Sequence, residues 1–112
     1  MLIKTILNKI EKFKSFIYGK VRLERMNGTE ALIVEVKARQ NTKGICPKCG
    51  KRRPAYDTQP VRFFEYVPLW GLPVYFRYAP RRTDCRRDGV LVEVLPWAEG
   101  KEHMTKTYMI FL

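Results

Sequence analysis

The amino-acid sequence predicts a small, mainly β protein of the α+β class, with one helix at the N-terminus and the start of a second at the C-terminus. Runs rich in Val, Ile, Phe and Tyr alternate with turn sequences through the middle of the chain, as in antiparallel hairpins. Before these runs lies a segment whose apolar residues have the spacing of a helix. Two cysteine-bearing turns separate the runs from one another. The 112 residues, 46% of them apolar, suffice for one domain with a modest core.

The N-terminal segment has the period of an amphipathic helix, with lysines mostly opposite the apolar face. Its apolar residues, spaced by three or four positions, are Leu2, Ile3, Ile6, Leu7, Ile10, Phe13, Phe16 and Ile17. Gly19 is expected to end the helix, so residues 1–18 form the first predicted unit. We expect this helix to cover a sheet or a partner subunit, which is a commoner use than lying on a membrane surface.

A first hairpin is predicted directly after the helix. Strand-like runs at residues 21–26 and 31–38 flank the dipeptide Asn27-Gly28. Asn and Gly both tolerate the positive φ angles of a type I′ turn, which joins two adjacent strands with two residues. The hairpin therefore opens the predicted β domain, residues 19–98.

A second hairpin and a last strand complete this β domain. The runs 61–67 and 72–78 are rich in Val, Phe and Tyr, and the segment Pro-Leu-Trp-Gly at 68–71 joins them. Residues 90–95 alternate around Glu93 as a last strand, which Pro96 ends.

The C-terminal region, residues 99–112, changes character from apolar to polar and then turns apolar again. Residues 104–112 are predicted to begin a helix that Thr105 caps. The chain ends where this helix has only started, so we expect residues 99–112 to be the start of a truncated helical region.

Two cysteine-bearing turns form the most specific motif of the sequence. The first, Cys-Pro-Lys-Cys-Gly, places Cys46 and Cys49 so that both thiolates reach one tetrahedral ion while backbone amides turn toward the sulfurs. The second begins at Cys85 and has the same spacing and trailing glycine, but Asp88 stands in the place of a fourth Cys or a His. We therefore predict a zinc-ribbon-like β-hairpin domain that holds Zn²⁺ through Cys46, Cys49 and Cys85, with Asp88 as the candidate fourth ligand.

Several alternatives for the cysteines stay open at this level. Water or a remote group such as His103 could fill the fourth position, or the site could have decayed and hold metal weakly. Three buried or free thiols are another interpretation, and so is a redox pair at Cys46 and Cys49, although no βαβ pattern surrounds it. A disulfide framework fits an odd number of cysteines poorly.

The net charge of +11 is unevenly distributed along the chain. Residues 1–40, 41–88 and 89–112 carry +5, +7 and −1 respectively. The excess gathers around the cysteines, and a concentrated basic surface attracts polyanions, although a charge run is more often only a solvated face. The residues expected to contact phosphate are Lys48, Lys51, Arg52, Arg53, Arg81, Arg82, Arg86 and Arg87.

Five motifs in order carry a family resemblance: Cys-Pro-Lys-Cys-Gly-Lys at 46–51, Leu-Trp-Gly-Leu-Pro-Val at 69–74, Arg-Arg-Thr-Asp-Cys at 81–85, Asp-Gly-Val at 88–90 and Val-Leu-Pro-Trp-Ala at 94–98. Over about residues 20–108 the chain resembles the N-terminal zinc-finger domain of a family of bacterial DDE insertion-sequence transposases. The resemblance implies a module that helps recognise double-stranded DNA at the terminal inverted repeats. In that family a helix-turn-helix region and a catalytic domain follow, and a Cys or His stands where this chain has Asp88.

The leading hypothesis is therefore a zinc-dependent DNA-binding module that is not itself an enzyme. A protein-interaction or self-association module and an RNA-binding zinc ribbon are the alternatives. The sequence contains no Ser-His-Asp, Cys-His or paired-carboxylate arrangement beyond chance, so we expect no small-molecule substrate. No run of eighteen apolar residues occurs, so we expect a cytoplasmic, nucleoid-associated protein without a membrane partner.

Overall fold

The computed structural model of the protein describes residues 2–98 and 103–111. Strands dominate it, which confirms the predicted mainly β class. In chain order the elements are α1 (Leu2–Ile10), β1 (Phe16–Met26), β2 (Thr29–Ala38), β3 (Gly44–Ile45), β4 (Arg52–Arg53), β5 (Ala55–Thr58), β6 (Arg62–Leu69), β7 (Leu72–Tyr78), β8 (Arg81–Cys85), β9 (Gly89–Val92) and α2 (Lys106–Phe111).

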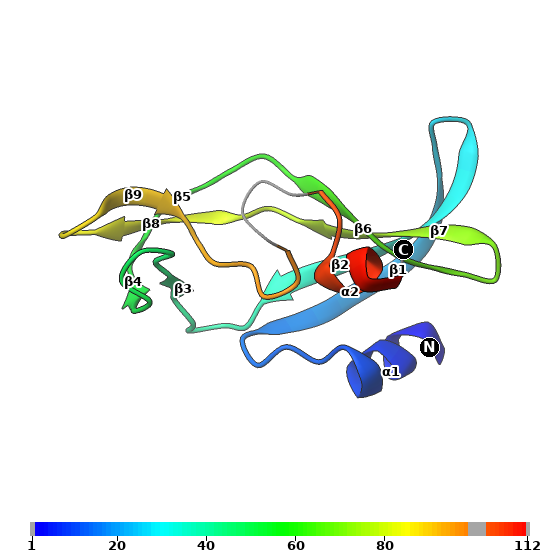
Figure 1. Cartoon of the computed structure of the whole chain (residues 1–112), viewed down its shortest axis with the longest axis horizontal. Helices are drawn as coiled ribbons and strands as arrows, with labels where there is room; N and C mark the ends of the chain where they lie inside the picture. Colours follow the sequence, from blue (N-terminus) through cyan, green and yellow to red (C-terminus); the bar gives the residue numbers. More distant parts are fainter. Residues whose placement is uncertain (1, 99–102, 112) are drawn as a thin grey trace.

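The strands form one larger sheet and two smaller ones. The four-stranded sheet has the order β1-β2-β7-β6, in which two antiparallel hairpins meet through a parallel β2–β7 pair. Strands β5-β8-β9 make a three-stranded sheet, and β3 pairs with β4. The molecule measures 45 × 25 × 24 Å, with the small sheets at one end and the β1–β2 and β6–β7 turns at the other (Figure 1).

Both hairpins of the larger sheet close through two residues with positive φ. Asn27 and Gly28 have φ of 53° and 79°, as the predicted type I′ turn requires. Trp70 and Gly71 repeat this pattern with 49° and 75°. A bulky residue rarely adopts this conformation, and the Trp70 side chain is 77% exposed at the tip of the hairpin.

The N-terminal helix is shorter than predicted. Helix α1 ends at Ile10, so Phe16 and Ile17 belong to β1, and Gly19 lies inside that strand instead of ending the helix. Residues 16–18 alternate between buried and exposed, which is the period of a strand. The ring of Phe16 packs edge-on against Trp97, 4.9 Å between centroids, so a tertiary contact outweighs the helical spacing of this apolar segment.

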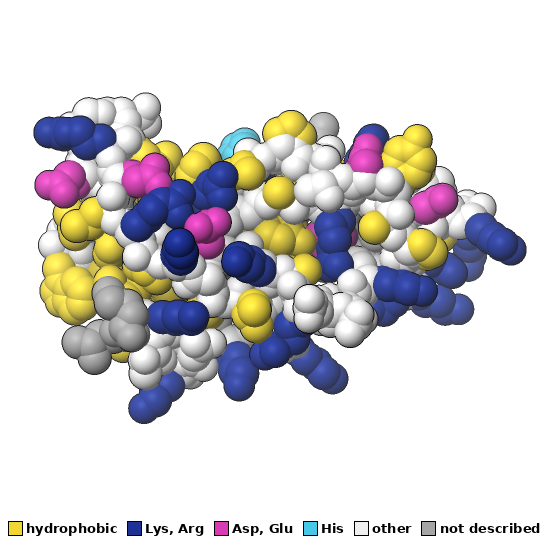
Figure 2. Space-filling model, turned by 180° about the vertical axis from the view of Figure 1, so that it is seen from behind, with side chains coloured by type: hydrophobic (Ala, Val, Ile, Leu, Met, Phe, Trp, Pro, Cys, Tyr) yellow, Lys and Arg dark blue, Asp and Glu magenta, His cyan; other side chains and the backbone are white. Residues whose placement is uncertain are grey.

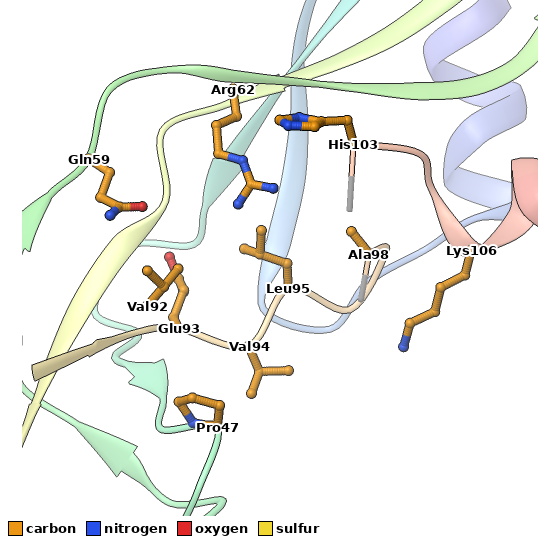
Figure 3. Close-up of a pocket in the computed structure, with 10 residues that line it drawn as sticks. All are labelled: Pro47, Gln59, Arg62, Val92, Glu93, Val94, Leu95, Ala98, His103 and Lys106. Atoms are coloured by element: carbon orange, nitrogen blue, oxygen red, sulfur yellow. The ribbon is translucent and has the colours of Figure 1, made fainter. Parts of the chain in front are cut away.

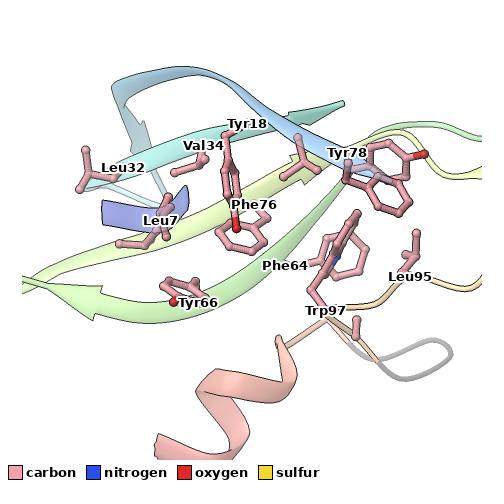
Figure 4. Close-up of a cluster of buried hydrophobic side chains, with 14 of the residues drawn as sticks. Leu7, Tyr18, Leu32, Val34, Phe64, Tyr66, Phe76, Tyr78, Leu95 and Trp97 are labelled. Carbon is pink, nitrogen blue, oxygen red and sulfur yellow. The ribbon is translucent and has the colours of Figure 1, made fainter. Parts of the chain in front are cut away.

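Trp97 lies at the centre of the hydrophobic core, although it belongs to the irregular segment after β9. Its side chain is 1% exposed and inserts beneath the larger sheet between Phe64 and Tyr78 (Figure 4). Five aromatic rings lie within 4.9–6.4 Å of its ring, those of Phe13, Phe16, Phe64, Phe76 and Tyr78. The segment that carries Trp97 is thereby held against the sheet.

The C-terminal helix begins where the sequence predicts it. The Thr105 hydroxyl accepts a hydrogen bond from the Tyr108 N–H at 3.2 Å, which is the expected cap. The segment before the helix runs along the edge of β6, because the Glu65 N–H donates to the His103 carbonyl and the Thr105 N–H donates to the Glu65 carbonyl. Residues 99–102 and 112 of the predicted C-terminal region lie outside the described residues.

Replacing Trp97 with Ala is expected to lower the free energy of unfolding by about 3–5 kcal/mol, because it removes a fully buried ring and leaves a cavity. Trp97→Phe keeps an aromatic ring and is expected to cost clearly less. The measurement is urea unfolding followed by far-UV circular dichroism. Trp70→Ala is the matched control, since that indole is exposed and its loss is expected to change stability by less than about 0.5 kcal/mol. Equal losses at the two positions would contradict the assignment of Trp97 to the core.

Candidate metal centre

The first cysteine turn has the backbone geometry of a metal knuckle. Strands β3 and β4 pair antiparallel on either side of it. The Cys46 N–H donates to the Lys51 carbonyl at 2.9 Å, and the Gly50 N–H donates to the Cys46 carbonyl at 2.9 Å. Gly50 has φ of +72°, a conformation that a residue without a side chain adopts at little cost. This turn, residues 46–50, is the first knuckle.

The second cysteine turn, residues 85–89, repeats this geometry at the tip of the β8–β9 hairpin and is the second knuckle. Cys85 pairs directly with Gly89 in the antiparallel ladder. Gly89 has φ of +84°, so the residue after the last candidate ligand is left-handed in both knuckles. The internal similarity predicted from spacing alone is therefore a similarity of backbone conformation.

The two knuckles bring the four predicted ligands together. The three sulfurs and one Asp88 oxygen all lie within 4.8 Å of one another. The Asp88 Oδ2 is 3.5 Å from the Cys46 Sγ and 3.4 Å from the Cys85 Sγ, and the sulfurs of Cys49 and Cys85 are 3.9 Å apart. A disulfide would need about 2.0 Å, and the three cysteines are free. This cluster could hold a metal ion, with Asp88 rather than His103 as its fourth member.

The surroundings of the cluster favour the thiolate form of Cys49. The pKa of Cys49 is lowered to about 7, first by the backbone N–H of Lys51 and further by the Arg53 guanidinium. The pKa of Arg53 is raised in turn by its hydrogen bond to Cys49 and by the charges of Cys49 and Cys85. Cys46 and Cys85 are buried, while Cys49 and Asp88 are partly exposed. Deprotonated sulfur is the form that binds metals.

A buried carboxylate, Glu93, positions the first knuckle. Its Oε2 accepts hydrogen bonds from the Tyr78 hydroxyl at 2.6 Å and the Arg81 N–H at 2.8 Å, and its Oε1 pairs with Arg81 Nη2 at 2.9 Å. Burial raises the pKa of Tyr78, and the bond to Glu93 acts in the same direction. A Cβ on Gly44 would lie only 2.9 Å from the Glu93 Cβ, so β3 packs directly on this network.

Of the eight predicted phosphate contacts, four are exposed at or beside the knuckles, and the other four are arginines that make contacts within the protein. Exposed cations lie in the two knuckles or directly beside them, at Lys48, Lys51, Arg86 and Arg87. Lys and Arg side chains cover much of the face shown in Figure 2, including this end of the molecule. The engaged arginines make internal contacts: Arg52 with Lys43 and Ser15, Arg53 with Cys49, Arg81 with Glu93, and Arg82 with Asp57. Of these four, Arg81 has the most buried ion pair, with its side chain 16% exposed.

Sequence reasoning missed the roles of Glu93, Gly44 and Arg53 around the cluster. Glu93 interrupts an otherwise apolar run, and a lone acidic residue in such a run is a recognisable sign of a buried ion pair. The need for glycine at position 44 depends on a contact across the fold with Glu93 and Thr83, which spacing along the chain does not indicate.

An open groove of about 620 Å³ lies between the segment after β9 and the start of β6 (Figure 3). Half of its lining residues are aliphatic and half are polar or charged, and the lining reaches from Pro47 in the first knuckle to His103. Among the described residues that line it, the only carboxylate is Glu93, which Arg81 and Tyr78 already engage.

No family model, no curated protein and no solved structure matches the chain. Among the described residues, no helix is long and apolar enough to cross a membrane.

Replacing Glu93 with Gln is expected to lower the free energy of unfolding by about 3 kcal/mol, because it leaves the charge of the largely buried Arg81 without a partner. Asp57→Asn is the matched control. It removes the carboxylate from the more exposed pair with Arg82 and is expected to cost at most about 1 kcal/mol. Chemical denaturation of both variants checks this difference, and a loss for Glu93→Gln no larger than that of the control would refute the role of Glu93.

Proposed function

We propose that this protein is a zinc-containing, DNA-binding module without catalytic activity of its own. The observation that carries the proposal is that two knuckles, about 40 residues apart in sequence, converge their ligand atoms on one point and present four exposed cations beside it. A small fold gains rigidity from such a metal, and the rigid knuckles then hold the cations in fixed positions.

Three of the six separations between ligand atoms of the cluster fit zinc as the metal, and all six are within 4.8 Å. Zn–S bonds of about 2.3 Å and Zn–O bonds of about 2.0 Å at tetrahedral angles give edges of about 3.8 Å between sulfurs and about 3.5 Å between sulfur and oxygen. The corresponding separations are 3.9 Å for Cys49 and Cys85, and 3.4 and 3.5 Å from Asp88 to Cys85 and Cys46. Three soft thiolates also select zinc over the hard cations magnesium and calcium.

The charge of the knuckles favours a polyanion as the partner. Among the described residues, none forms an ion pair with Lys48, Lys51, Arg86 or Arg87. Uncompensated cations near duplex DNA displace its condensed counterions, which is the main source of affinity for the phosphate backbone. The transposase resemblance adds a more specific partner, the terminal inverted repeats of an insertion sequence, and with it a cytoplasmic location near the bacterial nucleoid.

Protein purified without added zinc is expected to contain one zinc ion per chain by elemental analysis. Asp88→Cys is expected to bind zinc at least as tightly in chelator competition, because structural sites favour thiolate ligands, whereas Asp88→Ala is expected to bind it more weakly. Cys85→Ser, which removes a thiolate, should lose most of the metal. A parent protein without zinc, combined with an Asp88→Cys variant that gains it, would show that the site has decayed.

DNA binding is expected to depend strongly on salt and to weaken when the second knuckle loses its charges. In fluorescence anisotropy with a duplex, Arg86→Gln/Arg87→Gln is expected to reduce the slope of log K against log salt by about two units. Lys20→Gln/Lys37→Gln is the matched control, since it removes the same charge from exposed positions on β1 and β2.

Two outcomes would contradict the DNA-binding proposal. The first is a zinc-loaded protein with no affinity for duplex DNA at low salt. The second is tighter binding to an RNA hairpin than to a DNA duplex of the same length, which would identify the protein as an RNA-binding ribbon instead.

A further inference from the structure

A shallow hollow of about 380 Å³ lies beside the first knuckle, where two loops meet strand β4. One loop joins α1 to β1, and the other joins β2 to β3. Its lining is entirely polar or cationic and consists of Lys14, Ser15, Asn41, Thr42, Lys43 and Arg52. Only Arg52 among them was expected from the sequence to contact phosphate, and Lys14 and Ser15 lie about 30 residues before the first cysteine along the chain.

Two arginines hold the walls of the hollow together. Arg52 donates through Nη1 to the Lys43 carbonyl and through Nη2 to the Ser15 Oγ, both at 2.6 Å. Arg39 donates through its backbone N–H to the Ser15 carbonyl at 2.9 Å and through Nε to the Lys14 carbonyl at 3.0 Å. The two loops are therefore joined to each other and to the knuckle.

A third arginine fixes the loop between β2 and β3 to the interior. Arg81 donates through Nη1 to the Thr42 carbonyl at 2.7 Å, and Arg81 is itself held by Glu93. The Thr42 hydroxyl donates to the Arg39 carbonyl at 2.6 Å, and Asn41 turns the chain with φ of 63°. The hollow is thus preformed, and a ligand would not have to order it.

In the part of the chain that the structure describes, no ion pair neutralises the positive charge of the hollow. Arg39 and Arg52 donate to neutral oxygens, which orient a guanidinium without compensating its charge. Within residues 2–98 and 103–111, no ion pair involves Lys14, Lys43, Arg39 or Arg52. Arg52 uses two of its five N–H donors in the bonds above. Spare donors around uncompensated cations are what a phosphate group requires.

We propose that this hollow is a phosphate subsite that binds the backbone of duplex DNA. The inference rests on the proposed DNA-binding function and extends its surface from the knuckles to the α1–β1 loop. A nucleic acid is favoured over a free phosphate because Arg52 belongs to both the hollow and the knuckle strand β4. Lys and Arg side chains also continue from the knuckle end along the neighbouring edge of the molecule (Figure 2), so that one polyanion can contact both.

Lys14→Gln/Lys43→Gln in the zinc-loaded protein tests the subsite. Both side chains are exposed, and the substitutions leave the arginines that hold the loops in place. In anisotropy titrations with a DNA duplex, the slope of log K against log salt is expected to fall by about two units and the affinity at 0.1 M salt by at least about tenfold. The control Lys20→Gln/Lys37→Gln is expected to change both much less, and an equal effect in the control would overturn the subsite.

A second measurement separates failure of the subsite from failure of DNA binding. Inorganic phosphate, titrated against chloride at constant ionic strength, is expected to shift the amide NMR signals of Ser15, Asn41 and Thr42 in the parent and not in Lys14→Gln/Lys43→Gln. If these signals do not move, or others move more, the subsite is overturned. If they move but the parent does not bind DNA, the proposed function fails. If these signals move and the parent binds DNA, but Lys14→Gln/Lys43→Gln binds DNA with the same salt slope as the parent, the hollow binds free phosphate. Its assignment to DNA is then overturned.

Discussion

Glu93 joins the larger sheet to the three-stranded sheet, through its hydrogen bond with Tyr78 and its ion pair with Arg81. Glu93 is 4% exposed, and a carboxylate buried to this extent is stable only when cations and hydrogen-bond donors surround it. Its donors come from the end of β7, in the larger sheet, and from the start of β8, in the three-stranded sheet. The same arginine holds the β2–β3 loop through Thr42. The position of the first knuckle relative to the core therefore depends on this one carboxylate.

Asp88, the fourth member of the cluster, shows that a turn of this shape can present either a carboxylate or a thiolate as a candidate metal ligand. The carboxylate oxygen of an aspartate lies one bond further from Cβ than the sulfur of a cysteine, while zinc–oxygen bonds are shorter than zinc–sulfur bonds. These differences partly offset each other, so Asp88 reaches the cluster from a turn whose backbone matches that of the first knuckle. An aspartate rather than a cysteine at this position is therefore expected to affect the affinity and selectivity of the site more than its shape.

The sequence was sufficient to predict the features that depend on a few neighbouring residues, such as turns and helix caps. The Asn27-Gly28 turn, the Thr105 cap and the two cysteine-bearing turns depend on short-range spacing, and the structure contains all of them. That the two cysteine-bearing turns meet was inferred from their shared spacing, and their four candidate ligands do lie together. The predicted end of the first helix was wrong, because the apolar spacing of residues 13–17 fits both a helix and a strand. The contact between Phe16 and Trp97 favours the strand. The parallel β2–β7 pair and the hollow depend on contacts between segments that are far apart in the sequence. The spacing of neighbouring residues does not predict such contacts.

The parallel pairing of β2 with β7 also constrains the order of folding. Each hairpin of the larger sheet is local and has a two-residue turn, so each can form within microseconds. To join them the chain must close a loop that includes β3, β4 and the first knuckle, and the entropy of this closure makes it the slower step. Cys85 follows β7 directly in the next strand. We therefore expect the sheet and the cysteine cluster to assemble in one cooperative event rather than as separate folding units.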